Sequence, residues 1–270
     1  MEWSFCNMET KQNKKEKIKS IGKALDLLEF LSDNELEIGI VDISKKLNMS
    51  PSTVHRIITF LNSRGYVIKN QKTAKYRLGI KLFELGCTVQ STKNLIETIK
   101  PYLLQLSKSI NETSNLAILE SKEVIYIAKS ESSEMLTTNI KVGTRLPAHC
   151  TALGKVMLAY LSDGEFNQLY GSNEPVMSLT SRSIFSLDEL KKELKKVKEQ
   201  GYALDKEESI IGIHCVAVPI FYQPKEAIAA ISITGPASRF TIDKMEDTKG
   251  KLIAIAVSYT HLTLPTKRIV

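Results

Sequence analysis

Residues 40–61 read IVDISKKLNMSPSTVHRIITFL, and this stretch decides the fold of the first third of the chain. Apolar residues at spacings of three and four predict a short helix over 40–47, which a break at 48–49 ends. Ser50 and Pro51 then start a second helix, because serine is a favoured N-cap and proline is favoured at the first helical position. Two short helices joined by a tight turn predict a helix-turn-helix.

The flanking sequence extends this motif into a small domain. Apolar periodicity from Ser20 predicts a preceding helix that ends near Asp33. Beyond Gly65, residues 66–69 and 75–78 have the pattern of two strands joined by a polar turn. The order helix, helix-turn-helix, hairpin is that of a winged helix-turn-helix, which places its second short helix in the DNA major groove.

Positive charge is concentrated on this domain. The formal net charge of the chain is +7, and nine basic residues but no acidic one lie between Ile43 and Phe83. Such a stretch creates a positive potential that attracts polyanions, of which nucleic acid is the commonest. We therefore expect double-stranded DNA as a partner, while a solvated basic face and a protein-interaction module remain open. The expected contacts lie on the second helix and the wing: Ser50, Ser52, Thr53, His55, Arg56, Thr59, Lys72, Lys75 and Arg77.

Length and composition indicate the class of protein. With 270 residues, of which 43% are hydrophobic and 25% charged, the chain has the composition of a folded protein of two domains. No apolar run reaches the roughly 18 residues of a membrane-spanning helix, and the lysine-rich N-terminus does not have the pattern of a secretory signal. The four cysteines lack framework spacing, so we expect reduced thiols in a cytoplasmic protein without membrane contact. Residues 1–17 lack periodicity and are expected to form a disordered basic tail.

The remaining two thirds of the chain predict a different architecture. Residues 79–99 have the pattern of one helix, which Pro101 should kink or end. A capping box at Ser186 and Glu189 and a stop signal at Gly201 bound a later helix. The other expected elements are strands near 116–119, 124–128, 136–140, 202–207, 213–221 and 227–234 and a helix at 152–161. Strands bracketed by helices, with hairpins, predict an α+β fold with an antiparallel sheet.

No enzyme motif stands out in this part of the sequence, which has no P-loop, no dinucleotide-binding fingerprint and no nucleophile elbow. Two pairs, His149-Cys150 and His214-Cys215, leave open a zinc site or a cysteine nucleophile. Neighbouring residues in a strand point to opposite faces, so the second pair cannot easily reach one metal. We expect no metal, no cofactor and no enzyme activity, with Cys215 as a small buried side chain.

A binding pocket is the better interpretation of several C-terminal residues. The helix that begins at Thr151-Ala152 starts with small residues, and the N–H groups at a helix N-terminus attract anions. Ser232 and Thr234 alternate on one face of a predicted strand and offer hydroxyl groups. If both features face one cavity, a small carboxylate would fit it. The alternative is that the two hydroxyls face solvent.

Several motifs run in order along the chain from about Ile18 to Val257. The N-terminal ones are residues 40–44 (IVDIS), 52–56 (STVHR), 65–66 (GY) and 76–79 (YRLG). The C-terminal ones are residues 145–155 (RLPAHCTALGK), 201–208 (GYALDKEE), 212–220 (GIHCVAVPI) and 230–236 (AISITGP). Taken together, these motifs resemble the IclR (isocitrate lyase regulator) family of bacterial transcription factors.

The resemblance implies the organisation of the chain and its partners. It implies a winged helix-turn-helix DNA-binding domain at 18–79, a linker helix used in dimer contacts at 80–100, and an effector-binding domain related to the GAF fold at 101–257. The protein would then be a homodimer or a dimer of dimers that acts as a repressor at an operator, under the control of a small organic acid. Family members bind effectors at positions that match Leu136, Thr138, Leu146, Ala152, Leu153, Asp205, Cys215, Ser232 and Thr234.

Three of these residues depart from the family pattern, so the size of the pocket stays open. Thr138 stands where relatives that bind small keto acids have an apolar residue, Leu153 is larger than the alanine sometimes found there, and Thr234 replaces a frequent serine.

The end of the chain also departs from the family pattern, because residues 258–270 break the helical period and contain a proline. We interpret that segment as a non-native tail that resembles translated adapter sequence. An enzyme that uses Cys215 or a metal, and a ligand-sensing protein-interaction module, are the alternative functions.

Overall fold

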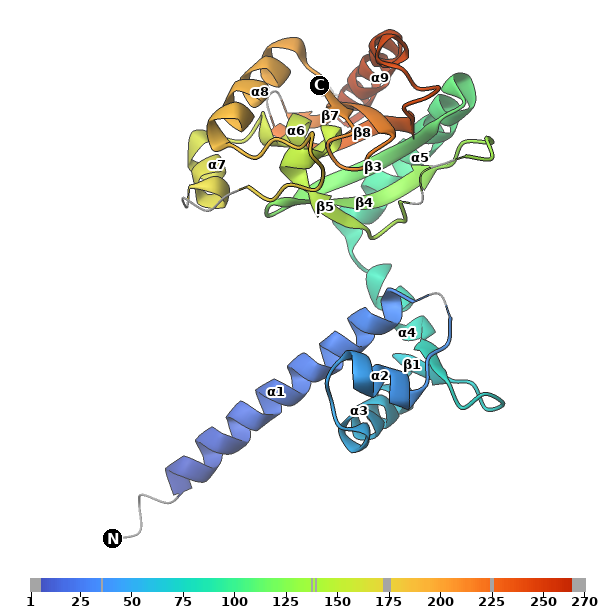
Figure 1. Ribbon diagram of the computed structural model, residues 1–270, viewed down its shortest axis with the longest axis vertical. Coiled ribbons are helices and arrows are strands. Elements are labelled where there is room, and N and C mark those ends of the chain that lie inside the picture. The colour runs from blue at the N-terminus through green and yellow to red at the C-terminus, as the bar shows by residue number, and fades with distance from the viewer. Residues whose placement is uncertain are drawn as a thin grey trace, which may run out of the picture. The chain divides into compact units, whose positions relative to one another are not determined.

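The computed structural model describes residues 6–34, 36–136, 138, 140–171, 176–223 and 226–263 (Figure 1). The chain divides into two compact units, Met1–Gln90 and Ser91–Val270, and each is described by itself below. The boundary falls inside the segment 80–100, which we expected to form a single linker helix.

The first unit is the predicted winged helix-turn-helix. Its elements are α1 (Cys6–Ser32), α2 (Ile40–Lys46), α3 (Pro51–Ser63), β1 (Val67–Lys69), β2 (Tyr76–Leu78) and α4 (Ile80–Gly86). Leu31 of α1, Ile43 of α2 and Ile58 of α3 are buried in one core. A bridge between Ile38 and Tyr76 attaches the segment before α2 to the antiparallel hairpin. This core holds α3 with its polar face outward.

The N-terminal helix is longer than the sequence pattern indicates. α1 begins at Cys6, whereas we expected residues 1–17 to be disordered. That segment has no apolar stripe, but lysine, glutamate and glutamine have good intrinsic helix propensity and can extend a helix that starts elsewhere. Residues 1–5 lie outside the described part of the chain.

The linker segment is two helices rather than one. α4 ends at Gly86, residues 87–89 form a turn, and α5 spans Gln90–Ile110. Pro101 lies inside α5 and does not end it. The reason is packing, because burial of five large side chains offsets the roughly 3 kcal/mol that an internal proline costs. These side chains are Leu95, Ile99, Leu103, Leu106 and Ile110.

The second unit is built on a six-stranded antiparallel sheet, as predicted for an α+β fold. Its strands are β3 (Thr113–Glu120), β4 (Glu123–Ser130), β5 (Arg145–Pro147), β6 (Ala203–Lys206), β7 (Ile213–Gln223) and β8 (Glu226–Pro236). The strand order is β5-β4-β3-β8-β7-β6, so β3 and β8 are the central pair. Residues far apart in the sequence, such as Asn115 and Ser232, are therefore direct partners across two strands.

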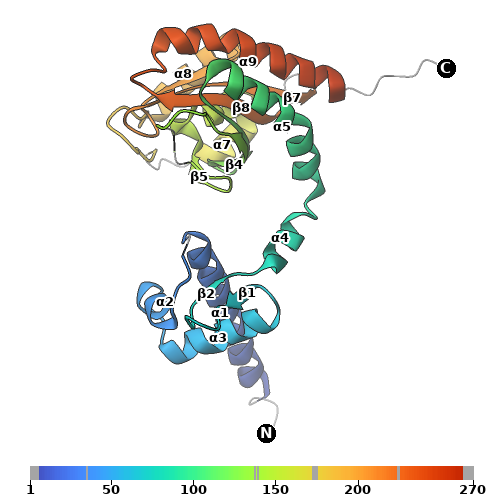
Figure 2. The same ribbon diagram turned by 90° about the vertical axis from the view of Figure 1, so that its right-hand side faces the viewer.

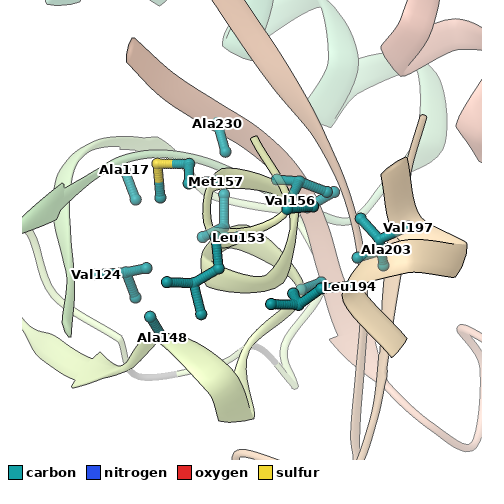
Figure 3. Packing of buried hydrophobic residues seen from close by; sticks show 14 of the residues in the cluster. Ala117, Val124, Ala148, Leu153, Val156, Met157, Leu194, Val197, Ala203 and Ala230 are labelled. Carbon is teal, nitrogen blue, oxygen red and sulfur yellow. The ribbon is translucent and has the colours of Figure 1, made fainter. Parts of the chain in front are cut away.

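Helices cover both faces of this sheet (Figures 1 and 2). One face packs against α5 and α9 (Ile242–Thr263). The other packs against α6 (Ala152–Leu158), α7 (Asp163–Tyr170) and α8 (Leu187–Gln200). Figure 3 shows side chains of α6 packed among residues of the sheet and of α8.

Several local expectations for the second unit were wrong. No strand is formed at residues 136, 138 and 140, which are the described residues of the predicted strand, and β5 follows instead at 145–147. The Ser186 side chain makes no cap hydrogen bond, although Gly201 ends α8 in the left-handed conformation (φ 78°) as predicted. A true capping box, in which Ser162 and Glu165 satisfy each other's backbone N–H groups, starts α7, a helix that the sequence analysis missed.

The last helix continues beyond the point where we expected it to end. α9 runs to Thr263, so residues 258–263 are helical in spite of the change in periodicity. Its innermost contacts come earlier, from Met245, Leu252 and Ala256. Within the described residues, no helix is long and apolar enough to cross a membrane.

Candidate functional site

Helix α3 presents a polar face to solvent. Its apolar residues Val54, Ile57, Ile58 and Leu61 are buried. The opposite face carries Ser52, His55, Arg56 and Thr59, all exposed, and the half-buried Thr53. The predicted buried and exposed faces of this helix are therefore confirmed. The side chains on the outer face do not belong to the hydrophobic core.

The N-cap of α3 has a structural role of its own. Ser50 Oγ accepts a hydrogen bond from the Thr53 N–H at 3.3 Å and lies 2.8 Å from Thr53 Oγ1. Because an N-cap satisfies one of the open N–H groups at a helix start, this bond fixes the first turn of α3. Ser50 thus fixes the start of the helix, while Arg56, six residues further on, is exposed on its outer face.

The wing hairpin is held by an acidic residue that the sequence analysis did not single out. Glu37 Oε2 accepts hydrogen bonds from Asn70 Nδ2 (2.7 Å) and Thr73 Oγ1 (3.1 Å), and Glu37 Oε1 lies 3.9 Å from Arg77 Nε. Asn70 Oδ1 in turn accepts from the backbone N–H of Lys72 at 2.9 Å. The turn is ordered by these bonds, and the Lys72 side chain is left exposed.

The site predicted in the second unit is assembled on one face of the sheet. Cys215 and Ala217 of β7 and Ala230 of β8 belong to the same core cluster as α6. Val216 and Ile231, their neighbours in sequence, belong to the opposite cluster with α5 and α9. Because side chains alternate along a strand, the residues at 115, 205, 215, 232 and 234 all face α6.

The two predicted hydroxyls are buried, which excludes the alternative that they face solvent. Asn115 Nδ2 donates to Ser232 Oγ at 3.3 Å and to Thr234 Oγ1 at 3.1 Å, and the Thr234 hydroxyl donates to Cys215 Sγ at 3.2 Å. Asn115 itself was missed by the sequence analysis. Its only signal is its place in β3, and the pairing of β3 with β8 was not predictable from local sequence. The cluster joins three strands through side-chain hydrogen bonds.

Asp205 uses its carboxylate to order a loop. Its Oδ1 accepts from the Glu208 N–H at 2.7 Å and the Ser209 N–H at 3.3 Å, and its Oδ2 accepts from Ser209 Oγ at 2.5 Å. Burial raises the pKa of Asp205 above its ordinary value, while the hydrogen bond from Ser209 and the charge of Lys155 act in the opposite direction. These bonds give Asp205 a role in ordering the loop at Glu208 and Ser209.

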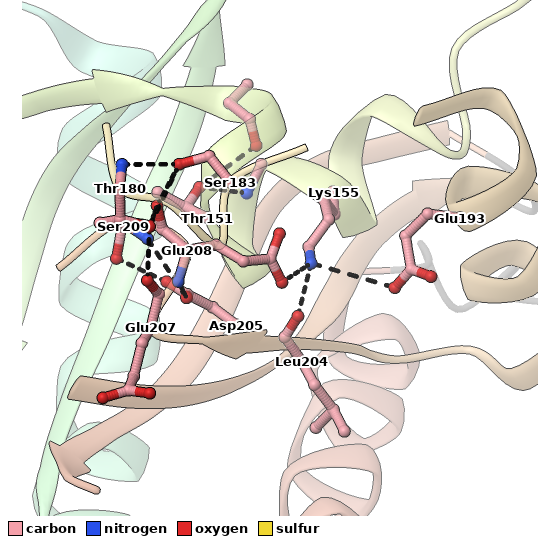
Figure 4. A network of polar contacts seen from close by, with 12 residues as sticks. Thr151, Lys155, Thr180, Ser183, Glu193, Leu204, Asp205, Glu207, Glu208 and Ser209 are labelled. Carbon is pink, nitrogen blue, oxygen red and sulfur yellow. Dashed lines mark hydrogen bonds and ion pairs between the residues drawn. The ribbon is translucent and has the colours of Figure 1, made fainter. Parts of the chain in front are cut away.

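A buried lysine ties α6 to the same loop (Figure 4). Lys155 is 1% exposed, and its Nζ lies 2.6 Å from Glu208 Oε1 and 2.6 Å from the Leu204 carbonyl oxygen. Thr180 and Ser183 donate to the carbonyl groups of Glu207 and Glu208 at 2.7–3.2 Å, so the preceding segment is docked on the loop as well. A buried charge needs a partner, and this one has a carboxylate and a carbonyl.

The start of α6 requires a glycine. A Cβ at Gly154 would lie 2.1 Å from the carbonyl oxygen of Ala148, in the 3-10 turn Ala148–Cys150. Thr151 caps the helix by accepting from the Gly154 N–H at 3.0 Å. Ala152 and Leu153, whose N–H groups come before it, are completely buried. The motif around Gly154 therefore brings the turn and the helix close together.

Two family models match this chain. The IclR helix-turn-helix domain matches residues 20–70, and the model described as the C-terminal domain of bacterial transcriptional regulator IclR matches residues 87–260. The chain belongs to the IclR family. It is accordingly a DNA-binding transcriptional regulator, and the predicted resemblance is confirmed.

Relatives of this IclR-family chain are similar over most of their length. The HTH-type transcriptional regulator XynR of Escherichia coli K12 is 37% identical over 222 residues, which cover 82% of this chain and 88% of XynR. The transcriptional repressor IclR of the same strain is 28% identical over 245 residues, which cover 90% of this chain and 89% of that repressor. The crystal structure of Thermotoga maritima IclR superposes with a TM-score of 0.76 at 30% identity and covers 91% of this chain and 99% of that one. The matches thus extend through both units of the regulator.

The other predicted effector positions, Leu136, Thr138 and Leu146, differ in their burial. Leu136 is 62% exposed, and its carbonyl accepts from Arg239, which is paired with the buried Glu112. Thr138 is buried, and its hydroxyl has no partner among the described residues. Leu146 of β5 is partly buried against the α6 side of the sheet. Leu136 is thus the one of these three predicted positions whose side chain is exposed.

The two His-Cys pairs do not form a joint site. His214 Nδ1 lies 2.8 Å from the Phe240 carbonyl oxygen, whereas Cys215 on the opposite face accepts from Thr234. No group of three potential metal ligands occurs among the residues that the structure describes. Burial, and then the Asp205 carboxylate, raises the pKa of Cys215 to about 12, so its thiol is protonated at neutral pH. A protonated thiol is a poor nucleophile, which weighs against the enzyme alternative for Cys215.

Proposed function

We propose that this regulator is a repressor whose affinity for its operator changes when a small organic acid binds in the second unit. Repression is supported by the similarity to a relative that is named a transcriptional repressor. The observation that carries the proposal of an acid is the buried hydroxyl at Ser232, which lies on the face of the sheet that packs against α6.

The hydrogen bonds around Ser232 suggest which group would meet the carboxylate. Thr234 gives its hydrogen to Cys215, so its hydroxyl is already used as a donor. Ser232 Oγ accepts from Asn115 Nδ2 and also pairs with the Cys215 thiol, so we infer that its hydrogen turns from that sulfur to the ligand when the acid binds. We infer that the carboxylate accepts from Ser232 Oγ and from the N–H groups of Ala152 and Leu153, since hydrogen bonds to an ionised acceptor are the strong ones. Asp205 would act through the loop that it orders.

The DNA contacts are proposed for the outer face of α3 and for the wing. Arg56 offers a planar fork that fits guanine or a phosphate, and Ser52, Thr53, His55 and Thr59 surround it. Lys72 and Lys75 on the wing would contact the phosphate backbone, while Arg77 is partly engaged by Glu37. We infer a homodimer or a dimer of dimers, which would place two recognition helices on half-sites about one helical turn apart.

The test combines DNA binding with an acid titration. A selected operator duplex, labelled for fluorescence anisotropy, is titrated with the full-length regulator at several salt concentrations. We expect the logarithm of the affinity to fall linearly with the logarithm of salt concentration. A panel of small keto, hydroxy and aromatic acids is then added, and at least one should release the DNA. If no acid in the panel alters DNA affinity, the proposed control is wrong, whereas salt-dependent binding would still stand.

A further inference from the structure

A cavity of about 540 Å³ lies in the second unit, at the end of β5 and beside the C-terminus of α7. Its volume is within the range of about 300–1,000 Å³ that is usual for small-molecule sites. Apolar walls are provided by Pro147, Leu169, Val176 and Met177. Among the described residues that line it, none belongs to the effector positions or to the Asn115 cluster, so it is a separate feature.

His149 lines this cavity and carries an acceptor with no partner. The side chain is 3% exposed, and its Nε2 lies 2.6 Å from the carbonyl oxygen of Met177. Because a carbonyl can only accept, Nε2 carries the hydrogen and Nδ1 presents its lone pair. Burial lowers the pKa of His149, which keeps the ring neutral at pH 7. No described residue donates to Nδ1.

Tyr170 lines the same cavity and carries an unpartnered hydroxyl. The residue is 6% exposed, its ring is stacked on Phe166 at 5.2 Å between centroids, and it meets the His149 ring edge-on at 6.1 Å. Burial raises the pKa of Tyr170 well above its ordinary value, so the hydroxyl keeps its hydrogen. No described residue pairs with this hydroxyl. Two unpartnered polar atoms thus sit in adjoining side chains of one cavity wall.

The charged groups that line the cavity are engaged with the protein. Lys122 Nζ lies over the Tyr170 ring at 5.7 Å from its centroid, and Glu123 forms an ion pair with Arg145 at 3.1 Å. Ser121 and Gln168 also line the cavity, and its buried polar atoms without a hydrogen-bond partner among the described residues are His149 Nδ1 and the Tyr170 hydroxyl. Buried polar groups in proteins are nearly always hydrogen-bonded, so this pair calls for a partner.

We propose that the cavity binds an uncharged ring compound that bears a hydroxyl group, for which phenol is the smallest model. The ligand hydroxyl would donate to His149 Nδ1 and accept from the Tyr170 hydroxyl, while its ring lies against Pro147, Leu169 and Met177. A carboxylate does not fit this pair, because it has no hydrogen to give to Nδ1. The proposed ligand class thus differs from that of the organic-acid site, and the proposal does not depend on that site.

Calorimetry of the full-length protein with phenol tests the proposal. The Tyr170→Phe variant removes one hydroxyl and keeps the ring, and His149→Gln keeps a donor near the position of Nε2 while removing the Nδ1 acceptor. We expect each variant to bind phenol about two- to tenfold more weakly than wild type, the usual effect of one lost neutral hydrogen bond. Anisole, which has no hydroxyl hydrogen, should bind wild type more weakly than phenol.

Two controls separate this cavity from the organic-acid site. Ser232→Ala should bind phenol as wild type does, and benzoate should not compete with phenol. Thermal melts establish whether the variants are folded. If His149→Gln is not folded, phenol binding by Tyr170→Phe alone tests the proposal. The proposal is overturned if wild type does not bind phenol, if Tyr170→Phe binds it as tightly as wild type, or if Ser232→Ala abolishes the binding.

Discussion

The two candidate sites of this regulator are built in opposite ways. The residues proposed to contact DNA lie within one short stretch of sequence, on α3 and the wing, and most of them are exposed. The residues proposed for the effector site are buried, come from β3, β6, β7 and β8 as well as α6, and most of them are hydrogen-bonded within the protein. A substitution in the first site should therefore change binding alone. A substitution in the proposed effector site should also change the free energy of unfolding, unless it leaves the hydrogen bonds and ion pairs within the protein intact.

The largest effect expected from this difference is at Lys155. Lys155→Ala leaves Glu208 buried without its cation, and breaking a buried ion pair by removing one partner costs about 3–5 kcal/mol of unfolding free energy. Urea denaturation followed by circular dichroism measures this. Lys195→Ala, an exposed lysine on α8, is the matched control and should change stability by less than about 0.5 kcal/mol. Equal stability of the two variants would contradict the buried role of the Lys155 ammonium.

The exposed site should show the reverse behaviour at Arg56. Arg56→Ala should cost about 1–3 kcal/mol of binding free energy at a selected operator, because one fork to a base or phosphate is lost, while the melting temperature stays within error. Lys72→Ala should instead weaken binding to all sequences alike and reduce the salt slope by about one. Fluorescence anisotropy on specific and random duplexes separates the two. If Arg56→Ala and wild type bind the selected operator equally, Arg56 does not read it.

Two serine variants, one on each face of the six-stranded sheet, test on which face the acid binds. Ser232→Ala removes the donor proposed for the carboxylate, and should weaken acid binding by about 1–3 kcal/mol without changing DNA affinity in the absence of acid. Ser114→Ala makes the same chemical change on the opposite face, where Ser114 Oγ donates to the Leu103 carbonyl at 2.8 Å. Isothermal calorimetry with an acid identified in the panel should therefore respond to the first variant and not to the second. An equal response would place the acid elsewhere.

The same contrast explains what could be predicted from the sequence. The helix-turn-helix was predictable because its signals are local, namely the apolar spacing of α3 and the Ser50-Pro51 start. In the second unit, the antiparallel α+β class and the common face of Ser232 and Thr234 were predicted, since they follow from alternation along one strand.

Features that depend on distant partners were not predictable. Asn115 joins the hydroxyl cluster only because β3 pairs with β8, and Glu37 holds the wing only because its segment bridges to β2. Pro101 was expected to kink or end a helix, but it lies inside α5, because the packing of α5 on the sheet outweighs the local preference. Tertiary contacts decide such cases, and the local pattern of one strand does not reveal which distant strand it pairs with.

The smallest effect is expected at the end of the chain, in the segment that we interpret as a non-native tail. Deletion of residues 259–270 should leave the melting temperature unchanged within about 2 °C. Ala256 is the last residue of α9 in the buried cluster, and Val257 and Ser258 after it are exposed. We expect the deletion to remove little buried area, because an added segment has no evolved packing partner, whereas a loss of 1 kcal/mol would shift the melting temperature by roughly 2–4 °C in a protein of this size. A second deletion that starts at Leu252 is the control and should lower it clearly, because it removes two buried side chains, Leu252 and Ala256. Differential scanning calorimetry of both deletion variants measures their melting temperatures. If the shorter deletion lowers the melting temperature by several degrees, the segment packs against the protein, and its interpretation as a non-native tail is wrong.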